Sequence, residues 1–328
     1  MHHILLENIG KRFIVRKRPE GRFGALRGAF TREKTVIQAL SGVNLNIAQG
    51  ELVGYIGPNG AGKSTTVKIM SGILTPDEGR VEIDGLVPYK QRARHVRRIG
   101  VVFGQRSQLW WDTPVRDSFE LLRDIYGVSQ ADYARRVDEL CQRLSAGDLL
   151  DTPVRQLSLG QRMRCELIAA LLHAPEILFL DEPTIGLDAV SKLALREFLR
   201  EYNRNDGVTM LLTTHDMDDI AALCRRVVVI GRGRALYDGT IDDLRRRYAP
   251  QHRLRARLTD ATMMPETIED ADALSVADGV LEVRFSPERV SAQALIARLA
   301  ALCPIADLTV EQDDIDEMIA AMYREMAL

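Results

Sequence analysis

The sequence predicts an α/β protein with a smaller α+β domain at its C-terminal end. Over residues 35–245, short apolar runs alternate with longer helical patterns, which is typical of parallel strands joined by crossover helices. Three of these runs, Glu51–Ile56, Ile177–Leu180 and Val208–Leu212, each end at a cluster of polar residues. Because ligands bind at the carboxyl ends of strands in open α/β sheets, we expect the three clusters to meet at one edge.

Length and composition set broad limits on the function. The chain has 328 residues, more than one domain usually needs, and its 46% hydrophobic and 27% charged residues are ordinary for a globular protein. A net charge of −2 gives no reason to expect a nucleic-acid partner. The cysteines have no metal-ligand spacing and suit buried thiols in a reducing compartment; they are Cys141, Cys165, Cys224 and Cys303.

The main domain is expected to span residues 1–245. Residues 1–15 are predicted to form an edge strand, and residues 16–34 form an insertion with seven basic and two acidic residues. We interpret this insertion as a solvated hairpin, with contact to an anionic membrane surface as the alternative. Residues 107–172 contain amphipathic helical patterns and are expected to form a mainly helical lobe beside the sheet.

The last stretch, residues 250–328, has fifteen acidic and seven basic residues. It contains an alternating strand, Val280–Phe285, followed by leucines at helical spacing. A second strand, Leu308–Val310, precedes a helix with isoleucines and methionines on one face. This pattern predicts a small α+β domain with an accessory or regulatory role.

Residues 57–64 read GPNGAGKS and match the phosphate-loop pattern G-x-x-x-x-G-K-[ST]. The loop follows a strand and opens a predicted helix, Lys63–Leu74, so its backbone N–H groups can surround a polyphosphate. Lys63 would contact the β- and γ-phosphates, and the Ser64 hydroxyl would bind Mg²⁺. The expected nucleotide contacts are Gly57, Pro58, Asn59, Gly60, Ala61, Gly62, Lys63, Ser64 and Thr65.

Two carboxylates, Asp181 and Glu182, directly follow the apolar strand Ile177–Leu180. A pair of acids at the end of a buried strand is costly unless a cation or water meets it. Together with the phosphate loop, this predicts that Asp181 belongs to the Mg²⁺ shell and that Glu182 accepts a proton from the attacking water.

Residues 157–161 read LSLGQ and precede a helix, just upstream of the carboxylate strand. With this motif, residues 1–245 resemble the nucleotide-binding subunits of ABC transporters, whose signature is usually LSGGQ. The resemblance implies a P-loop ATPase domain that takes ATP and pairs head to tail with a second copy. It also implies that Ser158, Gly160 and Gln161 reach the ATP held by the partner, and that Asp188 lines the subunit interface.

The same resemblance assigns three further residues. Gln105 would touch Mg²⁺ or the attacking water, and His215 would hydrogen-bond the γ-phosphate. Phe13 is the candidate platform for adenine, with Phe23 and Phe30 as alternatives because the insertion follows Phe13. Position 159 is leucine where glycine is common, but the serine and glycine that make the anion contacts are present.

No signal-peptide core or membrane-spanning run is present in the sequence, so transport would need separate permease subunits. We therefore expect a cytoplasmic protein at the cytoplasmic face of the inner membrane. The adjacent Trp110 and Trp111 either line a groove for a permease helix or are buried in the helical lobe. The motifs GQRSQLWWD and LDEPTIGLD look most like the exporter branch that pairs with ABC-2 type permeases, including drug and viologen export systems.

The competing interpretation is a non-transport ABC ATPase that acts in translation or DNA repair. The translation type usually has two cassettes in one chain, whereas this chain has one phosphate loop. The repair type places long coiled coils or zinc modules before the signature, and no heptads or CxxC pairs occur there. A degenerate cassette is disfavoured because Lys63, Asp181, Glu182 and His215 are all intact.

Overall fold

The computed structural model divides the chain into two compact units, Met1–Gly239 and Thr240–Leu328. The second unit begins slightly before the predicted boundary because α9 (Ile241–Tyr248) packs against α11 (Ile315–Glu325). The structure describes residues 2–16, 34–104, 106–248, 251–259, 265, 267–277, 279–312 and 315–325.

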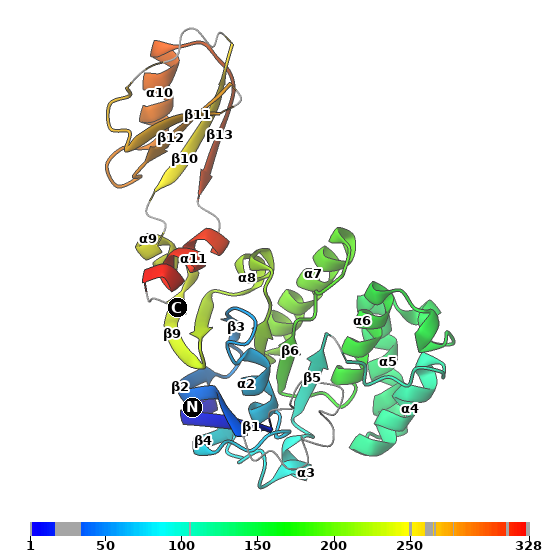
Figure 1. The fold of residues 1–328 in the computed structure, drawn as a ribbon. Coiled ribbons are helices and arrows are strands. Elements are labelled where there is room, and N and C mark those ends of the chain that lie inside the picture. The colour runs from blue at the N-terminus through cyan, green and yellow to red at the C-terminus, as the bar shows by residue number, and fades with distance from the viewer. Residues whose placement is uncertain are drawn as a thin grey trace, which may run out of the picture. The chain divides into compact units, whose positions relative to one another are not determined.

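A six-stranded sheet forms the centre of the first unit (Figure 1). Its strands β5, β6, β7, β3 and β8 pair in parallel, as the sequence predicts. Phe103 lies opposite Asp181, and Asp181 lies opposite Thr213, so the carboxyl ends of β5, β6 and β7 meet at one edge. In order, the strands are β5 (Ile99–Phe103), β6 (Ile177–Asp181), β7 (Thr209–Thr213), β3 (Leu52–Ile56), β8 (Arg226–Gly231) and β9 (Arg234–Thr240).

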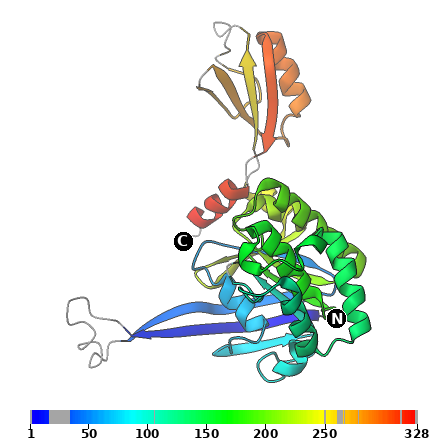
Figure 2. The ribbon, with the colours of Figure 1, turned by 90° about the vertical axis from the view of Figure 1, so that its right-hand side faces the viewer.

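A second, antiparallel sheet has the order β2-β1-β4, with β1 at His2–Arg16, β2 at Lys34–Ala48 and β4 at Glu78–Ile83. The predicted edge position of the N-terminal strand is therefore wrong, because β1 is the middle strand. Its two partners come from later in the chain, where a local pattern cannot reveal them. Figure 2 shows β1 and β2 projecting from the unit as a long hairpin, and most of the basic insertion at its end lies outside the described residues.

The predicted lobe at residues 107–172 is mainly helical and lies beside β5 (Figure 1). It contains α4 (Val115–Tyr126), α5 (Gln130–Leu144) and α6 (Leu159–Leu171), with short 3-10 turns at Gly147–Leu149 and Val154–Gln156. The other helices of the unit are α2 (Lys63–Met70), α3 (Arg92–His95), α7 (Ala189–Asp206) and α8 (Met217–Leu223). No helix in the described ranges has the length and apolar character needed to cross a bilayer.

The second unit contains a four-stranded antiparallel sheet in the order β11-β12-β10-β13. Its core is apolar and includes Leu254, Val283, Phe285, Leu295 and Leu299. Two strands, β10 and β11, were not predicted. In β10, apolar residues alternate with arginines over a short run, which is a weak strand signal. The elements are β10 (His252–Leu258), β11 (Ala273–Ala277), β12 (Val280–Phe285), α10 (Ala292–Leu302) and β13 (Ile305–Gln312).

Candidate functional site

The phosphate loop connects the end of β3 to α2, as predicted. Gly57 has no room for a side chain, because a Cβ there would lie 2.2 Å from the carbonyl oxygen of Ile230. Gly62 has a φ of +115°, and a Cβ on it would lie 2.6 Å from Leu40. Gly62 also caps α2 without a side-chain hydrogen bond, so the first N–H groups of the helix remain available to an anion.

Lys63 is the one charged residue of the phosphate loop, and only 6% of its surface is exposed. Its Nζ donates to the carbonyl oxygen of Gly57 at 2.6 Å and to that of Pro58 at 3.3 Å. Burial lowers the pKa of Lys63, while the nearby carboxylates of Glu182 and Asp181 oppose that shift. A phosphate would add the anionic partner that a buried ammonium group needs.

Asp181 joins the phosphate loop to the end of β6. Its Oδ1 accepts a hydrogen bond from Thr213 Oγ1 at 2.6 Å and from Ser64 Oγ at 3.2 Å. Sequence reasoning found Asp181 and Ser64 but missed Thr213. The signal for Thr213 is strand register, because it lies opposite Asp181 on the neighbouring parallel strand β7.

Glu182 has a φ of 56°, a conformation that costs a residue other than glycine about 1–3 kcal/mol. Its N–H donates to the carbonyl oxygen of Thr213 at 2.9 Å, which fixes the backbone at this position. Glu182 Oε2 lies 3.6 Å from Nδ1 of His215, and the His215 side chain is 60% exposed. The strained backbone therefore places the carboxylate beside an accessible imidazole.

Two clefts flank the phosphate loop. The larger has a volume of about 600 Å³, the smaller has about 210 Å³, and Asn59, Ser64 and Glu182 line both. Asp181 and His215 line the larger cleft, so the predicted carboxylates, histidine and phosphate loop come together. Gln105 lies outside the described residues, although its neighbours Gly104 and Arg106 line the larger cleft.

The signature residues form the start of α6. The Ser158 hydroxyl oxygen accepts a hydrogen bond from the N–H of Gln161 at 3.2 Å, and Gln161 Oε1 accepts one from the N–H of Ser158 at 2.9 Å. This reciprocal capping box fixes the first turn of the helix. Gln161 thus has a structural role that was not predicted, although the S-x-x-Q spacing was a signal for it.

The unusual Leu159 packs over a glycine of the loop before α7. A Cβ on Gly186 would lie 2.7 Å from Leu159 Cδ2, so the leucine occupies the space that the missing side chain leaves. Asp188 caps α7 and accepts hydrogen bonds from the N–H and Oγ of Ser191, which lower the pKa of its carboxyl. The start of α6 therefore lies against the start of α7.

Within one chain, these signature residues are separate from the phosphate-binding clefts. Of the described residues that line either cleft, none is Ser158, Gly160, Gln161 or Asp188. Ser158 is exposed to solvent.

Two aromatic predictions have different outcomes. Trp110 and Trp111 are 51% and 53% exposed, so the alternative that they are buried in the helical lobe is wrong. Phe13 is half-buried and lies opposite Ile37 in the β1–β2 ladder. Ile37 lines the smaller cleft, whereas Phe13 is not among the residues that line it.

A buried network behind His215 was not predicted. Asp219 is fully buried at the start of α8 and accepts hydrogen bonds from Thr184 Oγ1 and from Arg196 of α7, each at 2.5 Å. Asp216 accepts one from Lys192 at 2.5 Å. The network ties α7 to the segment that presents His215.

Comparison with known proteins identifies the family. The ABC transporter family model matches residues 40–185. The ATP-binding protein NatA of Bacillus subtilis is 34% identical over 66% of this chain and 87% of its own length. The daunorubicin resistance ATP-binding protein DrrA3 of Streptomyces coeruleorubidus is 37% identical over 63% of this chain and 65% of its own length.

Relatives and structures of other kinds match as well. A methionine import ATP-binding protein, MetN of Bordetella pertussis, is 34% identical over 86% of this chain and 76% of its own length. The dimeric post-hydrolysis structure of the cassette MJ0796 with ADP and Pi is similar to this chain, with a TM-score of 0.61 and 28% identity. The match covers 73% of this chain and 98% of the MJ0796 chain. The chain therefore belongs to the ABC transporter ATP-binding proteins and is an ATPase subunit of that family.

Proposed function

We propose that the chain hydrolyses Mg-ATP as one of a pair of ATPase subunits, and that closure of the pair drives a separate membrane permease. The observation that supports this most strongly is the meeting of two motifs at one cleft. Ser64 of the phosphate loop donates to Asp181, and the next residue, Glu182, lines the same cleft. ATP binding and water activation then belong to a single site.

The donor atoms at this site fit Mg²⁺. Ser64 Oγ and Asp181 Oδ1 are oxygens 3.2 Å apart, and Mg²⁺ prefers oxygen ligands. Ser64 and Asp181 would hold the ion, with Gln105 as a further proposed contact. The ion supplies neutralisation of charge on the β- and γ-phosphates when bound.

The protein groups divide the remaining work. Lys63 and the loop N–H groups bind phosphate oxygens and orient the γ-phosphate for attack. Glu182 accepts the proton of the attacking water, because it is the carboxylate beyond Asp181 that faces the cleft. His215, which lies beside Glu182, donates a hydrogen bond to the γ-phosphate.

A second copy of the chain supplies the rest of the site in this proposal. Ser158 Oγ accepts from Gln161, so its hydroxyl proton remains available to a phosphate oxygen. The thirteen-residue helix that follows directs its partial positive charge at the same place. Gly160 and Gln161 would complete this corner, and Asp188 would line the interface between the copies.

We propose Phe13 as the adenine platform. Residues directly opposite in an antiparallel pair project to the same face, so Phe13 and Ile37 share a face of the hairpin. Ile37 lines the smaller cleft, as do Gly62 and Thr65, and this supports the proposal that Phe13 contacts adenine. Phe23 and Phe30 lie outside the described residues.

The proposed partner is an ABC-2 type permease, with the chain at the cytoplasmic face of the inner membrane and export as the direction. The exposed Trp110 and Trp111 offer apolar surface for a permease helix. Since relatives include both a drug-resistance protein and methionine importers, direction needs its own test. Vesicles reconstituted with the chain and its permease should move cargo out of the compartment that holds ATP; movement into that compartment would refute export.

We also propose that the second unit is an accessory domain that braces the ATPase pair. Its acidic balance suits a solvated surface rather than an anionic ligand. Deleting residues 250–328 should weaken ATP-driven dimerisation while leaving ATP binding to the single chain unchanged. Equal dimerisation of the shortened and full chains would refute the brace.

The catalytic proposal is tested with Glu182→Gln. This variant should bind Mg-ATP normally, lose most turnover and accumulate as an ATP-bound dimer in light scattering after size exclusion. Glu197→Gln, an exposed glutamate of α7, is the matched control and should behave as the parent. Hydrolysis at the parent rate would show that Glu182 is not the base, and a monomeric Glu182→Gln at saturating Mg-ATP would refute the paired site.

A further inference from the structure

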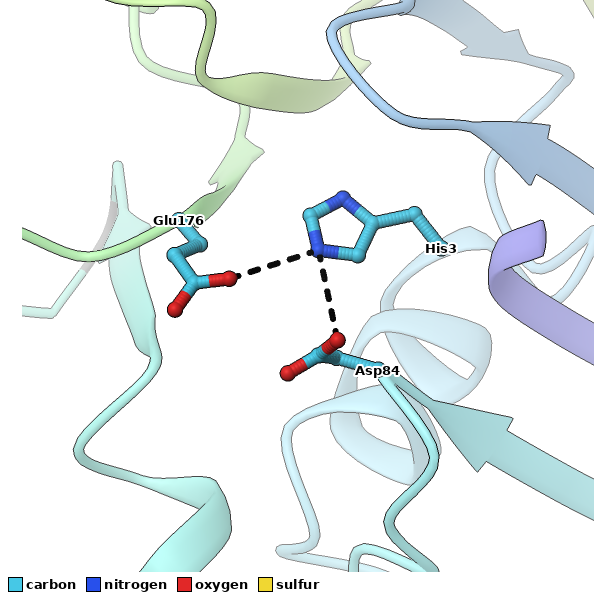
Figure 3. A group of neighbouring side chains, drawn as sticks. All are labelled: His3, Asp84 and Glu176. Carbon is cyan, nitrogen blue, oxygen red and sulfur yellow. Dashed lines mark ion pairs between the residues drawn. The ribbon is translucent and has the colours of Figure 1, made fainter. Parts of the chain in front are cut away.

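A second group of chemically active side chains lies at the opposite end of the central sheet from the ATP clefts. His3 belongs to β1, Asp84 follows β4, and Glu176 directly precedes β6. Nε2 of His3 lies 4.0 Å from Asp84 Oδ1 and 3.8 Å from Glu176 Oε2 (Figure 3). These three ligand atoms all lie within 4.8 Å of one another.

The imidazole of His3 is buried and points between the two carboxylates. Only 6% of His3 is exposed, and its Nε2 has no hydrogen-bond partner among the described residues. On the other side of the ring, Nδ1 lies 2.6 Å from Thr209 Oγ1. A buried ring nitrogen without a partner is costly, so its position between two acids calls for a further group.

Neither carboxylate forms a hydrogen bond with Nε2, because the separations of 4.0 and 3.8 Å exceed hydrogen-bond distance. Burial lowers the pKa of His3, Arg98 lowers it further, and Glu176 opposes both. In the tautomer whose Nδ1–H donates to Thr209 Oγ1, the unpartnered Nε2 presents its lone pair toward the two carboxylates. That is the form of histidine that ligates metals.

The backbone holds all three donors in place. Ile83 and Leu86 form two backbone hydrogen bonds, in which the N–H of each donates to the carbonyl oxygen of the other. They close a tight turn in which Asp84 and Gly85 have φ values of 47° and 71°. The N–H of Asp84 also donates to the carbonyl oxygen of His3 at 2.8 Å. Arg98 contacts the other oxygen of Asp84, which leaves Oδ1 facing the imidazole.

We propose that His3, Asp84 and Glu176 bind a divalent transition-metal cation, with Zn²⁺ as the best fit. One nitrogen and two carboxylate oxygens suit Zn²⁺ far better than Mg²⁺ or Ca²⁺, which prefer oxygen alone. Ligands bound tetrahedrally at about 2.0–2.1 Å are roughly 3.4 Å apart, so the two separations from His3 Nε2 need to close by about half an ångström. The two carboxylate oxygens, which lie within 4.8 Å of each other, need to approach by up to about 1.4 Å. The Glu176 side chain is 53% exposed and has room to make that movement.

Such an ion would fasten the N-terminal strand to the central sheet. His3 comes from the antiparallel sheet, whereas Glu176 enters β6 and its carbonyl oxygen accepts from the N–H of Thr209 in β7. Three protein ligands leave the fourth position of the ion to a water. The site is separate from the ATP clefts, because none of its three residues lines either cleft.

The test is Zn²⁺ titration of the chelator-treated full chain by calorimetry, without nucleotide. All variants are built on His215→Ala, so that Zn²⁺ held by Glu182 and His215 is not counted. Glu176→Gln and His3→Gln should each lose one equivalent of Zn²⁺, or bind it at least about tenfold more weakly. Glu197→Gln and His2→Gln, an exposed glutamate and the exposed neighbouring histidine, are the matched controls and should bind as the parent does.

Thermal unfolding gives a second readout. Zn²⁺ should raise the Tm of the parent and of both controls, but not that of Glu176→Gln, whose exposed position makes it the variant that keeps its fold. Millimolar Mg²⁺ or Ca²⁺ should not reproduce the shift. Zn²⁺ stoichiometry and Tm shifts that are the same in Glu176→Gln and Glu197→Gln would mean adventitious binding and would overturn the proposal.

Discussion

Thr213→Val tests whether the geometry around Asp181 controls magnesium binding. Valine has nearly the same shape as threonine, and Thr213 is fully buried, so the substitution removes a hydroxyl and little else. That hydroxyl donates to Asp181 Oδ1 at 2.6 Å, and after its loss Ser64 Oγ, at 3.2 Å, is the only donor to this oxygen among the described residues.

The size of the effect follows from the kind of hydrogen bond removed. A bond to a charged group contributes about 1.5–3 kcal/mol, which corresponds to roughly 10–150-fold in an equilibrium constant. Loss of a group that orients a metal ligand typically lowers metal affinity by about 10–100-fold. We therefore expect the Mg²⁺ concentration for half-maximal ATPase activity to rise by at least about tenfold in Thr213→Val.

The assay is steady-state phosphate release at saturating ATP over a Mg²⁺ series. Thr184→Val is the matched control, because Thr184 is also buried and its hydroxyl also donates to a carboxylate, that of Asp219. The control should lose a comparable amount of stability but keep the parent's Mg²⁺ dependence. A folded Thr213→Val protein whose Mg²⁺ dependence stays within twofold of the parent would refute the positioning role.

Three further predictions concern other parts of the chain. Lys63→Ala should abolish tight ATP binding in equilibrium dialysis, because it removes the cation of the loop; binding within threefold of the parent would contradict this. Ser158→Arg should impair turnover but not nucleotide binding, since the arginine blocks the partner's phosphate, whereas Ser145→Arg should leave turnover unchanged. Burial lowers the pKa of His173 to about 4, below its unfolded value of 6.5, so stability should fall as pH drops from 6.5 to 4. The loss should reach about 3 kcal/mol in denaturant titrations and should be smaller in His173→Gln; equal slopes would refute it.

The parallel sheet and the helical lobe were predictable because their signals are local. Apolar runs such as Ile177–Leu180 read as buried strands, and β6 is buried along its whole length. The predicted edge position of β1 failed for the opposite reason. Whether a strand has one neighbour or two depends on chain segments far along the sequence, and β1 pairs with both β2 and β4.

The ATP clefts were predictable in part. The phosphate loop is contiguous, so glycine geometry, Lys63 and Ser64 can be read directly from its pattern. The S-x-x-Q spacing of Ser158 and Gln161 is the signal of a capping box, although it was not used, whereas the packing of Leu159 over Gly186 needed the tertiary structure. A motif records which residues are adjacent in the chain, whereas these roles depend on which atoms are adjacent in space.

The sequence by itself determined the chemistry of this protein: a phosphate loop, a carboxylate pair and a signature in the order of an ABC ATPase. Those features lie within short segments, where backbone conformation follows from local residue types. Only the tertiary structure decided that Thr213 positions Asp181 and that His3, Asp84 and Glu176 converge. The register of strands distant in sequence sets these contacts, and it depends on the packing of the whole sheet.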